Sequence, residues 1–158
     1  MGQHGQNTDE GAAATALVFR AGSLLCALHL NEVVETMRPL AVQPLAGTPP
    51  YVRGVTIMRG VATPVIDVPR LLAGEQIEPE RFLAVRTEHG PVAFATGPVV
   101  GIRAAVPDGT ARHPALLRGT ASRLVAGVGL IDAEPLLLLR SMRVVPDEVW
   151  AAAAGVPS

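Results

Sequence analysis

Short apolar runs, bounded by glycine or proline, repeat along the chain from Thr15 onward. They recur at intervals of about 8–12 residues, a spacing typical of all-β barrels and sandwiches. Gly22-Ser23, Glu88–Gly90 and Asp132–Pro135 have the composition of hairpin turns. The pattern predicts strands at 16–21, 24–31, 52–58, 61–68, 81–87, 91–96, 99–105, 124–131 and 135–140.

Helical signals are few. The segment 30–37 could hold one or two turns with Asn31 as the cap, and 112–119 could form a short helix closed by Gly119. A third helix is predicted over 146–154, because a proline is followed by acidic residues that favour the positive end of the helix dipole. Sixteen glycines and fourteen prolines argue against long helices, and no internal repeat stands out.

The segment 51–72, YVRGVTIMRGVATPVIDVPRLL, is the most informative part of the sequence. Gly60 can take the backbone angles of a tight turn, so the valine-rich runs on either side of it can pair as a hairpin. Pro64 lacks a backbone donor, which predicts an edge or a bulge at that point of the second strand. Asp67 can accept hydrogen bonds from the backbone amides ahead of it, and we expect it to cap the turn at Val68-Pro69.

This order of residues resembles the hallmark of the CheW-like domain, the coupling module of bacterial chemosensory arrays. The shared features are an aromatic-Val-basic-Gly-Val strand, an Arg-Gly turn, a Pro-Val-Ile-Asp strand end and a basic-apolar-apolar helix start. The resemblance implies an all-β fold of two intertwined small five-stranded β-barrels (SH3-like subdomains) with a few short helices. It places a CheW-like domain at 15–150, followed by a C-terminal tail at 151–158. Residues 1–14 show no hydrophobic periodicity and are expected to form a disordered tail.

The flanking segments support the resemblance, with some departures. They are 16–35 and 44–50 upstream, and 82–102 and 124–139 downstream. The family's turn usually reads Asn-Leu-Arg-Gly, but here Ile57 stands at the Asn position. An acidic residue that commonly precedes the second-barrel Val-Gly-Val is absent from 96–101, and Arg140 stands where an Asn or Asp is usual. These departures affect which partner the protein would bind more than they affect the predicted fold.

The resemblance implies a non-catalytic adaptor with two binding surfaces. One would dock a CheA-type histidine kinase through a barrel face that includes Gly54 and Val55, where a mid-strand glycine would leave a flat patch. Arg59 would pair with Glu35 across the first barrel in a two-point geometry. The second surface would be an apolar groove for the cytoplasmic tip of a methyl-accepting chemoreceptor. A core position is the default for Val33 and Val34, but one of them could line this groove, and Val33 is the predicted residue.

Charge and composition narrow the remaining function classes. With a formal net charge of −1, the protein as a whole would not be attracted electrostatically to nucleic acid or to an anionic membrane. The only cysteine, Cys26, lies in an apolar run and is expected to be buried. No pair of histidines or cysteines has metal-ligand spacing, and no nucleophile or phosphate-loop motif is present. We therefore predict no catalytic residue, cofactor or metal.

No apolar stretch is long enough for a membrane helix, and the start of the chain is not that of a signal peptide. We expect a cytoplasmic protein, without direct membrane insertion, at membrane-associated receptor arrays. Three alternatives stay open. A small-ligand-binding β-barrel would need a closed apolar cavity, and the 3% aromatic content counts against it. A small enzyme would need polar groups converging in a cleft. A divergent CheW-like scaffold could serve a non-motility signalling system.

Overall fold

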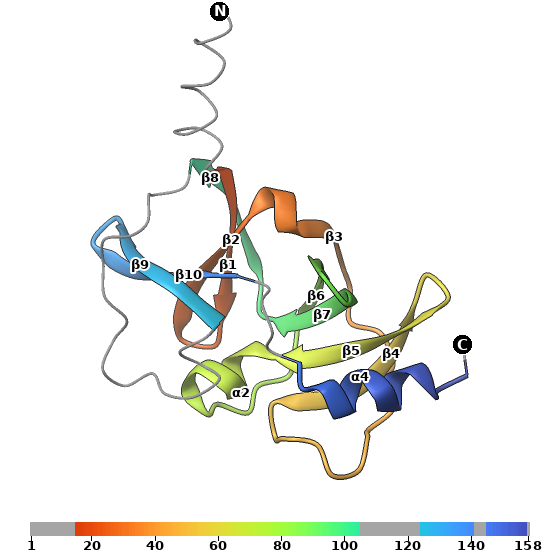
Figure 1. Ribbon diagram of the computed structural model, residues 1–158. Helices are drawn as coiled ribbons and strands as arrows, with labels where there is room; N and C mark the ends of the chain where they lie inside the picture. The colour runs from red at the N-terminus through yellow and green to blue at the C-terminus, as the bar shows by residue number, and fades with distance from the viewer. Residues whose placement is uncertain (1–14, 105–123, 141–144, 158) are drawn as a thin grey trace, which may run out of the picture.

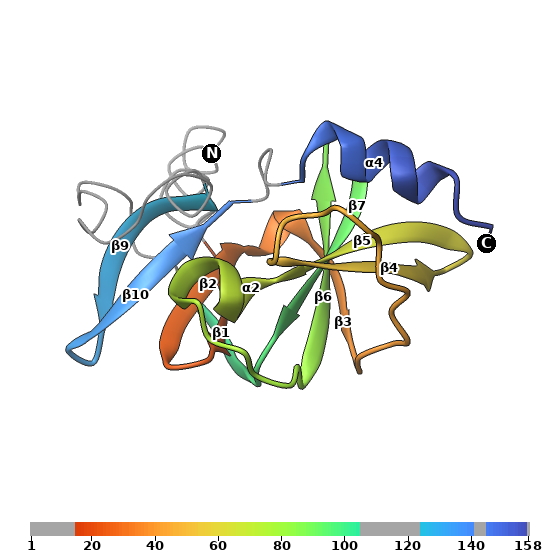
Figure 2. The same cartoon turned by 90° about the horizontal axis from the view of Figure 1, so that it is seen from below.

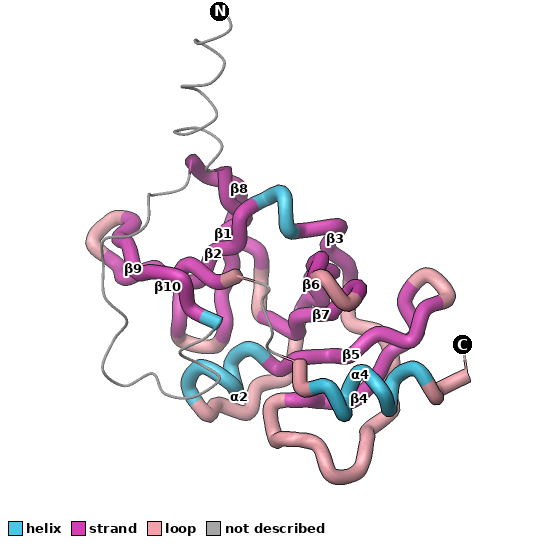
Figure 3. Tube along the Cα trace, viewed as in Figure 1, coloured by secondary structure: helices cyan, strands magenta, loops and turns pink. Residues whose placement is uncertain are grey.

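The structure is a computed structural model that describes residues 15–104, 124–140 and 145–157. These residues form two five-stranded sheets and a few short helices (Figures 1 and 3). Sheet A contains β1 (Thr15–Ala21), β2 (Leu24–His29), β8 (Val99–Ala104), β9 (Val125–Ile131) and β10 (Glu134–Leu139). Sheet B contains β3 (Val33–Met37), β4 (Val52–Met58), β5 (Val61–Asp67), β6 (Arg81–Thr87) and β7 (Gly90–Thr96). The helical segments are η1 (Leu30–Glu32), α2 (Val68–Ala73) and α4 (Asp147–Ala154).

The two sheets are intertwined along the chain. Sheet A has the strand order β8-β1-β2-β10-β9, and sheet B has the order β3-β6-β7-β5-β4. The chain leaves β2 to add β3 to sheet B, and it leaves β7 to add β8 to sheet A. Figure 2 shows the two sheets side by side, with α4 alongside β5. Each sheet thus contains strands from both halves of the sequence, as the resemblance predicts.

The two sheets also repeat one another strand by strand, which the sequence does not reveal. In each sheet one pair of neighbours is parallel, β2 with β10 and β5 with β7, and the other ladders are antiparallel. The β4–β5 and β9–β10 hairpins have matching registers, including the bulge that precedes Gly54 in β4 and Gly127 in β9. The chain is therefore a structural duplication in which each half contributes to both sheets.

Most strands bury both of their faces, which explains the continuous apolar runs in the sequence. One face of each sheet contributes to a shared cluster between the sheets, and the opposite face builds a smaller cluster of its own. Along β2, for example, Cys26 and Leu28 belong to the shared cluster, whereas Leu25 and Ala27 belong to the cluster of sheet A. The shared cluster includes Leu17, Phe19, Leu28, Ile66, Leu83, Phe94, Leu137 and Val149.

All nine predicted strands are present within one or two residues of their expected ends. The prediction for 30–37 is wrong in its second half. A 3-10 turn covers Leu30–Glu32 without a side-chain cap, and β3 follows at once because its valines pair with β6. The predicted helix at 112–119 lies outside the described residues. The third helix is confirmed, and since α4 continues to Ala154, the tail does not begin at 151.

The hairpin turn at Gly60 and the cap at Asp67 are confirmed, whereas the edge or bulge predicted at Pro64 is not, because β5 is an inner strand and the bulge lies in β4. Asp67 caps α2 by accepting a hydrogen bond from the backbone N–H of Arg70 at 3.2 Å. It also receives a hydrogen bond from Nη1 of Arg53 at 2.9 Å, a partner that the sequence did not suggest. Pro64 is tolerated because β5 pairs with β7 only from Val65 onward, so Pro64 lies outside that ladder.

Cys26 is expected to react slowly with a thiol reagent in the native protein. Its side chain is fully buried in the shared cluster, and burial raises the pKa of its thiol, which keeps the reactive thiolate scarce. The measurement is the labelling rate with and without denaturant. Denaturant should accelerate the reaction strongly, and fast labelling of the folded protein would contradict the placement of β2.

Candidate partner-binding surfaces

The turn between β4 and β5 carries the Arg59–Glu35 ion pair. Arg59 and Gly60 have positive φ angles of 55° and 78°, the combination found in type I′ hairpins. Arg59 donates from Nε to Oε2 of Glu35 at 2.9 Å and from Nη2 to Oε1 at 2.6 Å. Since Glu35 lies on β3, this planar contact joins the turn to an edge of sheet B. The predicted pairing of these two residues is confirmed.

This ion pair is accessible to solvent. The side chain of Arg59 is 77% exposed and that of Glu35 is 28% exposed. The hydrogen bond from Arg59 lowers the pKa of Glu35 below its usual value. The pair therefore stabilises the folded chain above the unfolded-state pKa of Glu35, and this contribution is lost as the pH falls through the lower folded-state pKa. Because water screens an exposed pair, its main effect is to fix the shape of the turn.

Gly54 and Val55 are buried, so the prediction of a flat, exposed patch at these residues is wrong. Gly54 has a φ angle of 139°, and a methyl group on it would overlap the carbonyl of Gln43 and lie 2.8 Å from Cα of Pro44. Val55 is 2% exposed and exchanges two backbone hydrogen bonds with Gln43, at 2.8 and 2.9 Å. The close backbone approach expected at Gly54 is made by the chain itself, where the segment after β3 returns to cover β4.

The two valines of β3 have different surroundings. Val33 is partly buried, pairs with Val85 and packs against the shared cluster, which is the core environment that was its default interpretation. Val34 lies at the bulge of β3 and is exposed beside Glu35. A contribution of Val33 to a receptor groove stays a prediction, and Val34 is the valine of this strand that offers an accessible apolar surface.

Exposed aliphatic side chains occur at equivalent positions in the two sheets. Val34 and Ile57 are exposed on sheet B, and their structural equivalents on sheet A, Val100 and Leu130, are exposed as well. Large exposed apolar side chains are a common feature of interaction sites when they gather. Their recurrence in both halves indicates two related surfaces, one on each barrel.

The turns beside these two surfaces carry opposite charges. Asp132 and Ala133, between β9 and β10, have positive φ angles of 50° and 69°, like the two residues of the β4–β5 turn. Asp132 is therefore the structural equivalent of Arg59. The two surfaces share a backbone shape but differ in charge, so they need not bind the same partner.

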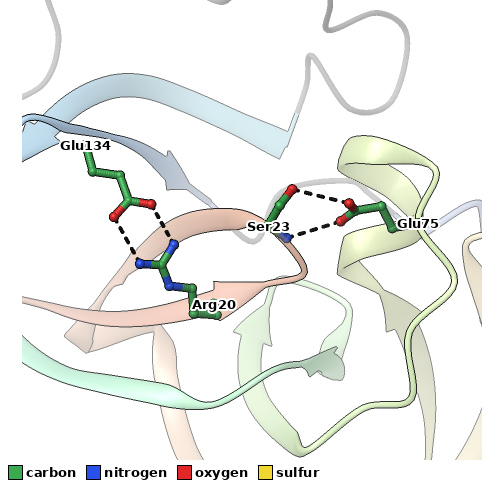
Figure 4. Close-up of polar contacts among 4 residues, drawn as sticks. All are labelled: Arg20, Ser23, Glu75 and Glu134. Carbon is green, nitrogen blue, oxygen red and sulfur yellow. Dashed lines mark hydrogen bonds and ion pairs between the residues drawn. The ribbon is translucent and has the colours of Figure 1, made fainter.

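Polar contacts anchor the β1–β2 hairpin to its surroundings (Figure 4). Arg20 of β1 donates two hydrogen bonds to Glu134 at the start of β10, at 2.6 and 3.0 Å. At the turn, Ser23 donates from its backbone N–H and its hydroxyl to Glu75, both at 3.2 Å. Because Glu75 follows α2, this contact ties sheet A to the chain that leaves sheet B.

Two open hollows lie on either side of Val156. The first, of about 370 Å³, is bounded by α4 and by the β4–β5 and β6–β7 turns. The second, of about 260 Å³, is bounded by residues 41–43, β4 and the segment after α4. Both are open to solvent, so neither provides the closed apolar cavity that a ligand-binding barrel needs.

Within the described ranges, no three His, Cys, Asp or Glu side chains are grouped so that they could hold a metal ion. In the same ranges, every helix is too short or too polar to cross a membrane.

Comparison with known proteins agrees with this geometry. Residues 15–149 match the family described as the CheW-like domain. The chain belongs to the CheW-like domain family. A curated relative, Protein FrzA of Myxococcus xanthus, is 36% identical over 88 residues, an alignment that covers 54% of this chain and only 55% of that protein.

The same CheW-like fold is found in a solved structure. The scaffolding protein TtCheW from Thermoanaerobacter tengcongensis superposes with a TM-score of 0.70, covering 84% of this chain and 92% of that one, at 16% sequence identity. This match confirms the expected pair of small intertwined β-barrels.

Sequence reasoning missed the exposed residues Val34, Ile57, Val100 and Leu130 as a related set. Ile57 was noted only as a departure from the family pattern. The available signal was the similarity of VRGVTIM in β4 to VAGVGLI in β9. The two segments share valine at their first and fourth positions and glycine at their third. That similarity is too short to stand out among many valine-rich strands without the matching ladder registers.

Proposed function

We propose that this protein is a non-catalytic adaptor that couples the cytoplasmic tips of methyl-accepting chemoreceptors to a CheA-type histidine kinase. The observation that carries the proposal is the bidentate Arg59–Glu35 pair on a solvent-exposed type I′ turn. A rigid, charged turn costs little entropy to present to a partner, because its shape is already fixed before binding. The family membership supports a scaffolding role.

The kinase surface is placed on the exposed end of sheet B. Arg59 and Glu35 supply the polar part of this surface, and Val34 and Ile57 supply apolar contacts beside them. Gly54 and Val55 act beneath it by holding the closed barrel in shape, rather than by direct contact. An apolar centre with a charged neighbour is the composition expected of a specific protein interface.

The receptor surface is placed between the two barrels, near the start of β3. Val33 packs against the shared cluster at this point, so a change there would alter the relation between the sheets. An amphipathic receptor helix would bind by laying its apolar face against aliphatic side chains. The cellular location that follows is the cytoplasmic side of membrane-associated receptor arrays.

Arg59→Ala is expected to weaken kinase binding about tenfold while leaving the thermal midpoint within a few degrees of wild type. The substitution removes both hydrogen bonds to Glu35 and leaves the turn free to change shape. Binding to the kinase's CheW-like regulatory domain should be measured by calorimetry, and unfolding by circular dichroism.

Arg81→Ala is the matched control. Arg81 is exposed on β6, and its side chain donates a hydrogen bond to the backbone carbonyl of Glu80. This variant should bind the kinase domain like wild type. If both variants bind equally well, the placement of the kinase surface on the β4–β5 turn is wrong.

A further inference from the structure

The larger hollow beside α4 plays no part in the function proposed above. Its volume of about 370 Å³ lies in the range of roughly 300–1,000 Å³ found for binding pockets. Three separate elements and the segment after α4 supply its walls, and none of the described residues that line it is Arg, Asp or Glu. The lining residues are Gly60, Val61, Ala62, His89, Pro91, Trp150, Ala153, Ala154 and Val156.

An aromatic wall is the most distinctive feature of this hollow. Trp150 is the only tryptophan of the chain, and it lies partly exposed at the hollow, whereas all three phenylalanines are buried. Its ring is tilted by 56° against the ring of His89, with the centroids 5.8 Å apart. Gly90 also lies beside the indole ring, since a Cβ on it would be in van der Waals contact with that ring at 3.7 Å. An aromatic pair in such a position offers an apolar face to a ligand.

The chain's own C-terminal segment lies beside this hollow. Val156 lines both the larger and the smaller hollow, and Pro157 lines the smaller one. An uncharged Val-Pro dipeptide therefore lies beside the two hollows, with Val156 lining the larger one and both residues lining the smaller one.

We propose that the larger hollow binds an extended, proline-containing apolar segment of a partner protein. A lining without carboxylates or guanidinium groups disfavours charged side chains, which would lose their hydration without gaining a partner. Proline-rich segments already adopt an extended conformation in water, so they lose little entropy when they dock against an aromatic-lined groove. The hollow adjoins the Arg59–Glu35 surface, because Gly60 of the β4–β5 turn lines it. The proposal does not depend on the adaptor role.

The test uses fluorescence anisotropy with a fluorescein-labelled peptide of about ten residues, built from alanine, valine and proline, and added to the full chain. A second peptide carries alanine in place of every proline. We expect saturable binding of the first peptide at micromolar to millimolar concentrations, and binding at least about tenfold weaker for the second.

Two glutamate substitutions on α4 locate the site. Ala154 is exposed and lines the hollow, whereas Ala152 is exposed on the same helix and does not line it. Ala154→Glu should weaken peptide binding about tenfold by placing a carboxylate in the hollow. Ala152→Glu should bind like wild type, and both variants should keep the wild-type circular dichroism spectrum.

Three outcomes would overturn the proposal. They are the absence of saturable binding of the proline peptide, equal binding of the two peptides, and equal effects of the two glutamate substitutions. Kinase binding by the same variants distinguishes this site from the proposed adaptor surface. Ala154→Glu should bind the kinase domain normally, whether or not it binds the peptide.

Discussion

Gly54→Ala is expected to destabilise the protein by at least about 2 kcal/mol. The backbone at Gly54 has a φ angle of 139°, a conformation that costs a side-chain-bearing residue about 1–3 kcal/mol. The added methyl group would also overlap the carbonyl of Gln43, and overpacking of this kind costs about 1–3 kcal/mol. At roughly 2–4 °C per kcal/mol for a chain of this size, the thermal midpoint should fall by roughly 5–15 °C.

Gly47→Ala separates the two costs. Gly47 also has a positive φ, 77°, but a Cβ on it would meet nothing within 4 Å. It should therefore show only the backbone cost of about 1–2 kcal/mol. The free energy of unfolding of both variants should be measured by urea denaturation. If Gly54→Ala is no less stable than Gly47→Ala, the segment 41–43 does not close sheet B against β4.

This glycine shows where sequence reasoning about the site succeeded and where it failed. A mid-strand glycine correctly predicted a close backbone approach, because only a residue without Cβ permits one. The sequence could not show which backbone approaches it. Gln43 lies in a segment with no strand pattern, and its bridge to Val55 depends on the path of the chain after β3. The predicted contact with a partner was therefore an internal contact.

The fold was more predictable than the site because its signals are local. The turns at Gly22-Ser23, Arg59-Gly60 and Asp132-Ala133 each contain a glycine or an aspartate, residues that favour tight hairpins, and the apolar runs beside them set the strands. The strand β3 was missed because a short edge strand with alternating burial, beginning directly after a 3-10 turn, has too few residues to show a period. The exchange of β3 and β8 between the sheets was predicted only through the family resemblance.

The Arg59–Glu35 pair was predictable only through that resemblance. The two residues are 24 positions apart, and charge patterns over such a separation do not identify a contact. The same limit applies to Arg53 and Asp67, which meet because of the bulge in β4. Long-range ion pairs depend on strand register, which local propensity does not determine.

Because each sheet contains strands from both halves of the chain, we expect the two barrels to unfold together. Phe94→Ala should destabilise both of them by about 3–5 kcal/mol, the usual cost of removing a buried phenylalanine side chain. Phe94 is fully buried on β7 of sheet B, in the cluster that it shares with Phe19 and Cys26 of sheet A. A defect in this cluster removes contacts from both sheets at once.

The chain offers one native probe for each barrel. Trp150, on α4, contacts the β6–β7 turn of sheet B, and Cys26 lies on β2 of sheet A. Urea unfolding followed by Trp150 fluorescence and by the labelling of Cys26 should give coincident transitions in the wild type. Phe94→Ala should shift both transitions to lower urea by the same amount.

If Phe94→Ala does not fold, Phe94→Leu is used in its place. Phe82→Ala is the matched comparison. Phe82 is buried in the cluster that belongs to sheet B alone. If the barrels unfold as one unit, this variant also shifts both transitions together, because sheet A depends on β8, which the chain forms directly after β7. If the Trp150 transition moves to lower urea while Cys26 stays protected, the barrels unfold independently. The exchange of strands then does not couple their stabilities.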